Sequence, residues 1–344
     1  MKNSAFNFKV LLVYTVISMR IGVYGFGAIG RLVTRLLVER GHEIVGVVDI
    51  DERIVGRDVG EVLGIGRIGV EVSKGISVLE TADVVIHATG SYLDKIYSQI
   101  VSVVEIGVNV ISTCETLAYP YYRYPVLAKR LDELARTYGV VVIGTGINPG
   151  FIFDTLVVLL ASSVPNVTWI RAVRSLDAAK RREPFRRKIG VGMKPETVRE
   201  MLSKGEITGH VGYAESVHLI AQAGDLHLTR VEEYQEPVIA EEFVESAGIR
   251  VESGLNKGIV GRGVGYVGDR EVIRLELYAY VGAPEYDHIT IKSKEYTVEW
   301  RSNGTPGDLG TASIVVNTAE KVLQLPPGLR LVTELLPVKI KFSV

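Results

Sequence analysis

The chain has 344 residues, 47% of them hydrophobic and 23% charged, which is the composition of a globular protein of one or two domains with a large core. Its formal net charge of −1 argues against a general nucleic-acid binder, because binding to a phosphate backbone needs a basic surface. The single cysteine, Cys114, excludes an internal disulfide and a cysteine-rich zinc site, and it is typical of a reducing cytoplasm, where we expect this chain to act.

Residues 1–18 precede the first element of the predicted fold. Their apolar run, residues 10–17, is far shorter than the roughly 20 residues that span a bilayer. Lys2 and Lys9 resemble the start of a signal peptide, but no small-residue cleavage site follows. We therefore interpret residues 1–18 as an extension upstream of a start at Met19, with a membrane anchor as the alternative, and we expect no membrane partner.

A glycine-rich motif follows the first predicted strand, residues 20–24. In the pattern G-x-G-x-x-G at a strand-to-helix turn, the first glycine makes the turn and the second lets a pyrophosphate approach the backbone. The third glycine lets the helix pack closely on the strand, and the phosphates then face the helix N-terminus. The alternative is a glycine turn in some other α/β protein. The residues that we predict to bind a dinucleotide here are Gly25, Phe26, Gly27, Ala28, Ile29 and Gly30.

The second predicted strand, residues 43–49, ends in an acid. Asp49 stands 24 residues after Gly25, where a carboxylate accepts hydrogen bonds from the adenosine ribose. The same charge repels a 2′-phosphate, so we predict NAD as the preferred cofactor. NADP stays an alternative, because Arg53 could turn toward such a phosphate.

Strands and helices then alternate up to residue 149. Apolar runs predict parallel strands at residues 83–88, 108–112 and 140–143, and helices lie between them. This alternation predicts a Rossmann-type, doubly wound parallel sheet over residues 19–149. Ligands bind where such strands end, so we expect Thr89, Gly90 and Asn148 in the cofactor site. An alternative role for Asn148 is to cap the apolar helix predicted over residues 151–163.

The pattern changes in the second half of the chain. Residues 150–305 contain mostly strands, several with period-2 alternation, which predicts an α+β domain with a mixed, mostly antiparallel sheet for substrate binding and dimerisation. Residues 306–344 contain a last amphipathic helix and a tail, which we expect to return to the first domain. Together these segments give an α/β protein with a cleft between two domains.

Several segments carry a family resemblance. They resemble the dihydrodipicolinate reductase-like amino-acid dehydrogenases, and among these most closely the 2,4-diaminopentanoate dehydrogenase family. The resemblance implies a nicotinamide cofactor, a small amino-acid substrate, oxidative deamination at a side-chain amine, and a homodimer or higher homo-oligomer. The segments that carry it are MRIGVYGFGAIGR, ADVVIHATGS, VNVISTCETLAYP, GTGINPGFIFDTL, PFRRKIGVGM, GHVGYAES and NGTPGDLGTASIVVNTAEKV.

One departure from the reductases themselves is informative. Dihydrodipicolinate reductases carry adjacent histidines and an Asp-Ala-Pro-Ser-Gly-Thr segment, whereas the six histidines here are never adjacent. This departure argues against reductase activity on dihydrodipicolinate. An imine reductase of that type stays an alternative to the deaminating enzyme. A second alternative is an NAD-binding redox sensor without turnover.

Two residues are candidates for acid–base chemistry. Glu115 follows a predicted strand, where a carboxylate could hold the substrate ammonium or accept its proton. His210 lies between glycines and titrates in a suitable range. The alternatives are a helix-capping role for Glu115 and a structural role for His210.

A dense basic run, residues 180–188, predicts a loop that binds the substrate carboxylate, because arginine offers bidentate geometry. Within it we select Arg186, Arg187 and Lys188, and independently Arg174 at the end of a strand. The alternative is a solvated loop or a subunit contact.

We interpret Cys114 as a small buried core residue. No His/Asp/Glu cluster has metal-ligand spacing, so we predict no metal. Only four glutamines occur, which favours a thermophilic source.

Overall fold

The computed structural model describes residues 18–336, so the predicted extension, apart from Ser18, and the end of the tail lie outside the described residues. The first domain contains a seven-stranded parallel sheet in the order β15-β6-β5-β4-β1-β2-β3, which confirms the doubly wound prediction. Its strands are β1 (Arg20–Tyr24), β2 (Glu43–Val48), β3 (Val72–Ser73), β4 (Val84–His87), β5 (Asn109–Ser112), β6 (Val141–Gly144) and β15 (Gly328–Arg330). The last strand, β15, comes from the C-terminal segment, which joins the sheet of the first domain.

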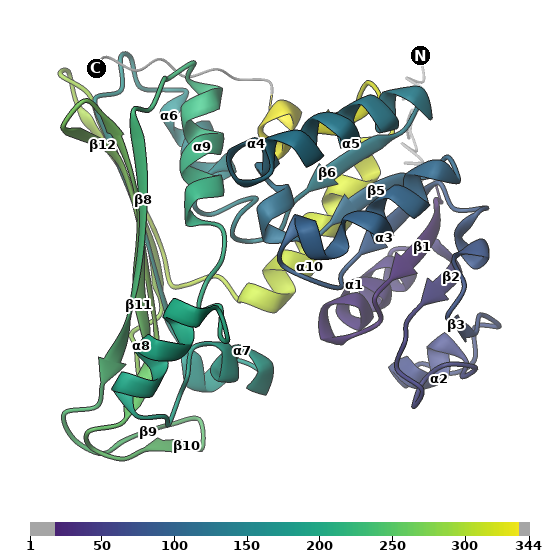
Figure 1. Ribbon diagram of the computed structural model, residues 1–344, viewed down its shortest axis with the longest axis horizontal. Helices are drawn as coiled ribbons and strands as arrows, with labels where there is room; N and C mark the ends of the chain where they lie inside the picture. Colours follow the sequence, from purple (N-terminus) through teal and green to yellow (C-terminus); the bar gives the residue numbers. More distant parts are fainter. Residues whose placement is uncertain (1–17, 337–344) are drawn as a thin grey trace, which may run out of the picture.

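Helices cover both faces of this sheet (Figure 1). The helices α1 (Ala28–Glu39) and α10 (Gly307–Val322) pack together on one face, and α3 (Leu93–Glu105) and α5 (Pro125–Thr137) lie on the other. The central strands are buried on both sides, which explains their unbroken apolar sequences. Two short helices, α2 (Val59–Leu63) and α4 (Pro120–Arg123), complete the domain.

The second domain is built on a six-stranded sheet in the order β14-β13-β7-β12-β11-β8. All its pairs are antiparallel except β7 with β12, so the predicted mixed sheet is confirmed. Its strands are β7 (Trp169–Asp177), β8 (Arg230–Ile239), β11 (Asn256–Val267), β12 (Arg270–Tyr280), β13 (Tyr286–Lys292) and β14 (Thr297–Ser302), and a hairpin is formed by β9 (Val244–Ser246) and β10 (Ile249–Val251).

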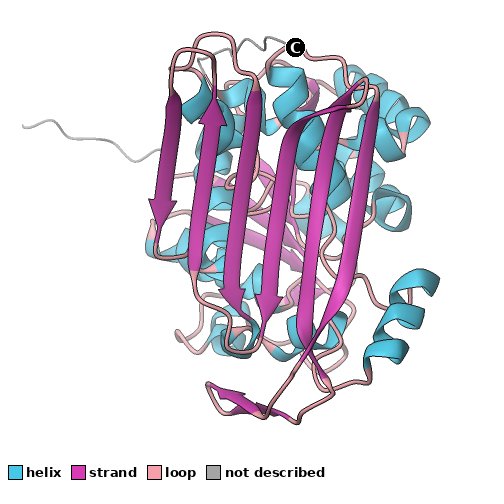
Figure 2. Ribbon diagram, turned by 90° about the vertical axis from the view of Figure 1, so that its left-hand side faces the viewer, coloured by secondary structure: helices cyan, strands magenta, loops and turns pink. Residues whose placement is uncertain are grey.

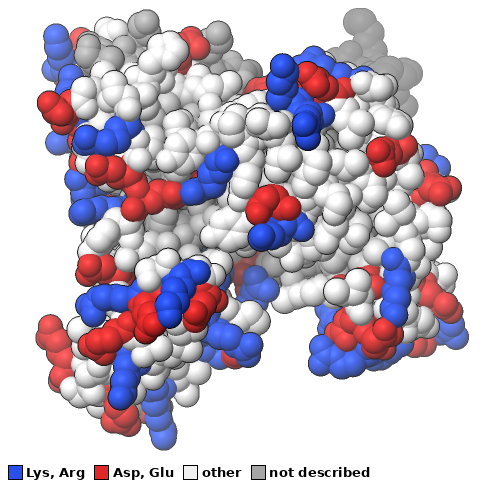
Figure 3. Space-filling model, in the orientation of Figure 1, with Lys and Arg blue, Asp and Glu red and all other residues white. Residues whose placement is uncertain are grey.

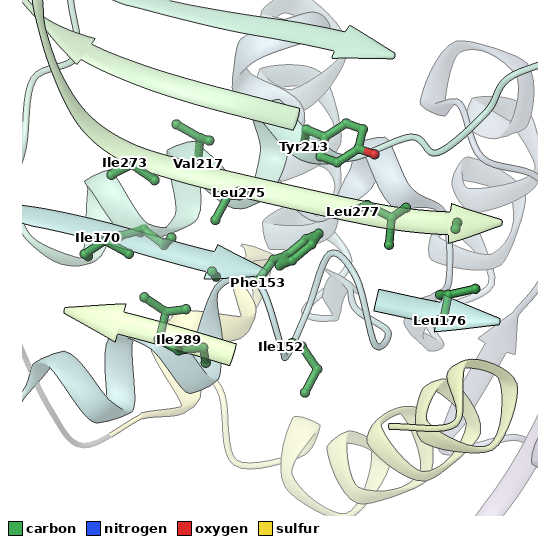
Figure 4. Close-up of a cluster of buried hydrophobic side chains, with 14 of the residues drawn as sticks. Ile152, Phe153, Ile170, Leu176, Tyr213, Val217, Ile273, Leu275, Leu277 and Ile289 are labelled. Atoms are coloured by element: carbon green, nitrogen blue, oxygen red, sulfur yellow. The ribbon is translucent and has the colours of Figure 1, made fainter. Parts of the chain in front are cut away.

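Within residues 18–336, helices cover one face of this sheet. The helices α6 (Thr155–Ala161) and α9 (Tyr213–Ala223) pack on it and enclose an apolar core, in which Phe153, Ile170 and Leu275 are fully buried (Figure 4). Figure 2 shows the strands of this six-stranded sheet side by side in front, with helices behind them and beside one edge. The remaining helices, α7 (Glu183–Lys188) and α8 (Pro195–Lys204), lie at the lower end of this domain in Figure 1.

Three local predictions were wrong. The apolar helix expected over residues 151–163 is only α6, because Asp154 caps it and the preceding residues form turns. Arg174 does not end a strand, because β7 continues to Asp177. The basic run is not a loop throughout: its residues 183–188 form the helix α7, which Pro184 and Glu183 favour in its first turn.

Candidate functional site

A cleft of about 370 Å³ lies between the two domains, at the carboxyl ends of the parallel strands. Figure 3 shows it as a hollow between the lower-left lobe and the right-hand part of the molecule, with Lys and Arg side chains at its margin. The first domain and α10 contribute Gly27, Ala28, Ile29, Ala88, Thr89, Gly90, Ser91, Thr113, Cys114, Glu115, Thr145, Gly146, Ile147, Asn148, Pro149, Asp308 and Thr311. The second domain contributes Arg174, Leu176, Arg181, Arg182, Pro184, Phe185, Lys188, His210 and Leu277.

The glycine-rich loop has a distinct geometry at each glycine. Gly25 has a φ of +97°, and a Cβ on Gly30 would lie 2.0 Å from the Gly25 carbonyl oxygen, so both positions require glycine. A Cβ on Gly27 would meet nothing within 4 Å, because this residue faces the open cleft. Gly27 is also the N-cap of α1, and no side chain caps the helix. The free N–H groups of α1 therefore face a space that an anion can enter.

Asp49 lies directly after β2, next to this loop. One carboxylate oxygen accepts a hydrogen bond from the Phe26 amide at 2.5 Å, and the other accepts one from the Asp51 amide at 2.9 Å. Arg53 does not approach Asp49, because its guanidinium binds both oxygens of Asp51 at 2.8 Å each. These bonds from Arg53 lower the pKa of Asp51 to about 2. The cation that we considered for a 2′-phosphate is thus already paired.

The structure brings the predicted strand-end residues into one wall of the cleft. Thr89 and Gly90 follow β4, Glu115 follows β5, and Asn148 follows β6. The Asn148 side chain accepts a hydrogen bond from the Phe153 amide at 3.2 Å, whereas the N-cap of α6 is Asp154. The capping role that we considered for Asn148 therefore belongs to Asp154.

Arg174 lies in the opposite wall, on the covered face of the second sheet. It is 2% exposed, and its guanidinium donates to the Thr305 carbonyl and lies 3.7 Å from the Asp287 carboxylate. Its Nη1 is buried and has no hydrogen-bond partner within the described part of the chain. Burial lowers the pKa of Arg174 to about 10, so the group is still cationic at neutral pH. A buried cation with an unused donor in a cleft is suited to an anionic ligand.

The basic helix α7 presents only one of its sides to the cleft. Lys188 lines it, and its ammonium lies 5.5 Å from the centre of the Phe185 ring. Burial lowers the pKa of Lys188, whereas the charge of Glu115 across the cleft opposes that shift. Arg181 and Arg182, which we did not select from the sequence, also line the cleft and bind Asp308.

Arg186 and Arg187 do not line the cleft, contrary to our selection of them. Arg187 is exposed and binds Glu183 one helical turn earlier at 2.6 Å, and Arg186 donates to the Arg181 carbonyl. Within α7, the residues that line the cleft are Pro184, Phe185 and Lys188, and Lys188 follows the other two by four and three positions, so all three share one side of the helix. Arg186 and Arg187 lie on its other sides.

His210 lies in the cleft wall against the Tyr213 ring, with a centroid distance of 4.6 Å. Its Nε2 is buried without a partner among the described residues. Burial, with smaller effects of Lys188 and Arg174, lowers the pKa of His210 to about 3. The imidazole is therefore neutral near pH 7, and it is better suited to hydrogen bonding than to proton transfer.

The remaining candidates have structural roles. Burial raises the pKa of Cys114 to about 12, so its thiol is protonated and unreactive at neutral pH. Asp154 is fully buried and accepts hydrogen bonds from the Gly150 and Thr155 amides and the Ser216 hydroxyl.

Among residues 18–336, no group of three or more His, Cys, Asp or Glu residues is arranged to hold a metal ion. No helix in this same range is long and apolar enough to cross a membrane.

Comparisons with known proteins cover nearly all of the chain. Residues 151–342 match the family described as 2,4-diaminopentanoate dehydrogenase C-terminal domain, and residues 19–114 match dihydrodipicolinate reductase, N-terminus. The 2,4-diaminopentanoate dehydrogenase of Acetoanaerobium sticklandii is 31% identical over 335 residues, which cover 92% of this chain and 93% of that protein. The 4-hydroxy-tetrahydrodipicolinate reductase of Archaeoglobus fulgidus is 46% identical over only 72 residues, 21% of this chain and 27% of that protein.

Solved structures show the same fold. The amine dehydrogenase from Mycobacterium smegmatis superimposes with a TM-score of 0.81 at 25% identity, covering 92% of this chain and 95% of that one. GenD2 from gentamicin A biosynthesis, in complex with NAD, superimposes with a TM-score of 0.55 at 15% identity, covering 89% and 87%.

The burial of His210 predicts a pH dependence of stability. An unfolded histidine binds a proton near pH 6.5, whereas the folded protein keeps His210 neutral down to about pH 3. Between these values the unfolded state binds more protons, so the free energy of unfolding falls as the pH falls. We expect His210→Gln to reduce this loss in urea unfolding between pH 7 and pH 4, and His227→Gln, at an exposed position, to leave it unchanged. Equal losses in all three proteins would contradict a buried neutral imidazole.

Proposed function

Because the chain belongs to the 2,4-diaminopentanoate dehydrogenase family, we propose that it oxidatively deaminates a diamino acid of the 2,4-diaminopentanoate type with NAD or NADP. It is an NAD(P)-dependent dehydrogenase that acts on the CH–NH2 group of an amino acid. The observation that carries the proposal is that one cleft joins a glycine-rich loop, the carboxylate of Glu115 and a cationic wall in which Arg174 is buried.

The first-domain wall is suited to the dinucleotide. Gly25 and Gly30 shape the loop, and Gly27 leaves room for the pyrophosphate at the uncapped N-terminus of α1. Asp49 has lone pairs free for the ribose hydroxyls besides those that accept the two backbone N–H groups. When bound, the nicotinamide accepts the hydride from the carbon that bears the amine. Phe26, Ala28, Ile29, Thr89, Gly90 and Asn148 complete the proposed cofactor site.

The opposite wall is suited to the substrate carboxylate. Arg174 has a buried, unused donor, and Lys188 lies in the same wall. Arg181 and Arg182 take the place that we had predicted for Arg186 and Arg187. A wall of this charge favours an amino acid over a simple amine, because an uncharged substrate end would leave the buried Nη1 of Arg174 without an acceptor.

Glu115 is the proposed partner of the reacting amine. Its carboxylate lies in the cleft across from the cations, where it can hold the substrate ammonium and accept its proton. Loss of that proton is required, because a hydride leaves readily only from a carbon that bears a neutral amine. His210, being neutral, contributes a hydrogen bond to the substrate. Water then hydrolyses the imine to the ketone and ammonia.

The two alternatives are not favoured. Sequence identity to the 4-hydroxy-tetrahydrodipicolinate reductase of Archaeoglobus fulgidus extends over only 72 residues, and the match to the reductase family covers residues 19–114, whereas residues 151–342 match the deaminating family. A sensor without turnover does not account for the carboxylate of Glu115 opposite the cationic wall.

The cytoplasmic location and the thermophilic source stay predictions from composition.

The oligomeric state is also untested, and we propose a homodimer formed through the uncovered face of the second sheet (Figure 2). On that face Tyr278 and Tyr280 lie beside paired charges such as Arg171 with Glu276, a mixture that is typical of protein interfaces. We expect light scattering to show a dimer, and Tyr278→Glu to yield monomers, because it places a charge in the interface. A wild-type monomer would exclude this interface.

The proposed reaction is tested by following reduced-cofactor absorbance with 2,4-diaminopentanoate and a panel of diamino acids. We expect turnover by the wild type, and we expect Glu115→Gln to lower kcat by about 100-fold or more, because an amide cannot accept the proton. Glu105→Gln, an exposed glutamate on α3, is the matched control and should keep full activity. Cofactor binding without turnover of any amino acid would instead support the sensor.

The choice of cofactor depends on Asp49. We expect the wild type to prefer NAD modestly, because this carboxylate repels a 2′-phosphate and Arg53 is paired with Asp51. Asp49→Ser should shift the ratio of kcat/KM for NAD and NADP toward NADP by about tenfold. Asp269→Ser, in an exposed turn, is the control. A strong preference of the wild type for NADP would show that Asp49 does not face the ribose.

A further inference from the structure

Asp308 lines the cleft, and the proposed reaction gives its carboxylate no role. It stands in the first turn of α10, and its two carboxylate oxygens bind two different arginines. One oxygen accepts a hydrogen bond from Arg181 Nη2 at 2.7 Å, and the other lies 3.2 Å from Arg182 Nε. A single carboxylate therefore holds two arginines that are adjacent in sequence.

This arrangement joins the two domains across the cleft. The helix α10 packs on α1 and β5 of the first domain, whereas Arg181 and Arg182 follow β7 of the second. The ion pairs thus connect residues that are 127 positions apart for Arg181 and Asp308. The orientation of the two arginines depends on how the domains sit together.

The neighbours of Arg181 hold its guanidinium in one place. A Cβ on Gly307 would lie 1.7 Å from Arg181 Nη1, so the guanidinium rests against the bare backbone at the start of α10. The Phe185 ring lies on it, with a distance of 4.7 Å to the ring centre. Arg181 Nε is buried and has no acceptor within the described part of the chain, so one donor of a fixed fork is unused.

From these contacts we propose that Asp308 is a positioning residue that prepares Arg181 and Arg182 to bind the substrate carboxylate. Two neighbouring guanidiniums repel each other, and the shared carboxylate offsets that repulsion while fixing their planes. A guanidinium that is already oriented loses less entropy when it binds a second carboxylate. The proposal rests on the proposed function, because it assigns that site its selectivity for substrates with a carboxylate.

The kinetic test compares Asp308→Asn with Glu183→Gln. Glu183→Gln removes the carboxylate partner of an exposed arginine, Arg187, in the same basic segment outside the cleft. Each protein is assayed with 2,4-diaminopentanoate and with 1,3-diaminobutane, the same molecule without the carboxylate. We expect Asp308→Asn to raise KM for the amino acid by about tenfold, with a smaller change in kcat and no change in KM for NAD. The kcat/KM for the diamine and all parameters of Glu183→Gln should be unchanged.

A second variant perturbs the same contact by a different route. Gly307→Ala displaces the Arg181 guanidinium but keeps the Asp308 carboxylate, and should raise KM for the amino acid alone in the same way. If Asp308→Asn does not fold, this variant decides the kinetic test. An equal loss with both substrates, or no loss in either variant, would overturn the proposal.

A chemical test is independent of turnover. Phenylglyoxal modifies accessible guanidiniums, and peptide mass spectrometry locates the products. We expect Arg181 and Arg182 to react faster in Asp308→Asn than in the wild type, and only Arg187 to react faster in Glu183→Gln. If the wild type turns over no amino acid, the proposed function fails while this labelling still reports on the arginines. Unchanged labelling of Arg181 and Arg182 in Asp308→Asn would refute their positioning by Asp308.

Discussion

The burial of positive charge beside the cleft is the constraint on which the rest of the site depends. A buried guanidinium is costly unless it is paired and hydrogen-bonded, and both Arg174 and Arg181 lie next to a carboxylate. Arg174 has Asp287, which is itself fully buried and is fixed by the hydroxyls of Ser302 and Thr305 at 2.8 and 2.7 Å. Asp308 serves Arg181 in the same way. Each of the two arginines keeps one buried nitrogen, Nη1 of Arg174 and Nε of Arg181, without a partner among the described residues, and both residues line the cleft.

The cleft also depends on how the chain closes on itself. The C-terminal segment adds α10 and β15 to the first domain after the second domain is complete, so the chain passes between the two domains twice. A second ion-pair group lies at the α4–α9 contact, where Arg123 binds Glu233 and the fully buried Glu215, the latter at 2.6 Å. Burial raises the pKa of Glu215 to about 7 against the opposing charge of Arg123. Polar contacts therefore join the domains at two places, and the apolar cores lie on either side.

The two domains contribute different parts of the cleft because their sheets are built differently. In a parallel sheet that helices cover on both faces, ligands bind at the carboxyl ends of the strands. The glycine loop, Glu115 and Asn148 meet at these ends. The second sheet uses one face for the core and for Arg174. Its long strands are rigid, so the position of Arg174 within the second domain is well defined.

The sequence by itself determined the first domain and its loop, because a strand, three glycines and an acid at fixed spacing are local features that one fold accommodates. It also predicted the wall containing Glu115, since parallel strands end at one edge. Only the tertiary structure decided which basic residues face the cleft. Lys188 rather than Arg187 does so because α7 packs in one orientation. Arg181 precedes that helix, and its partner Asp308 lies on a helix far along the chain. The neutrality of His210 was equally beyond the sequence, because desolvation depends on every element packed around the ring.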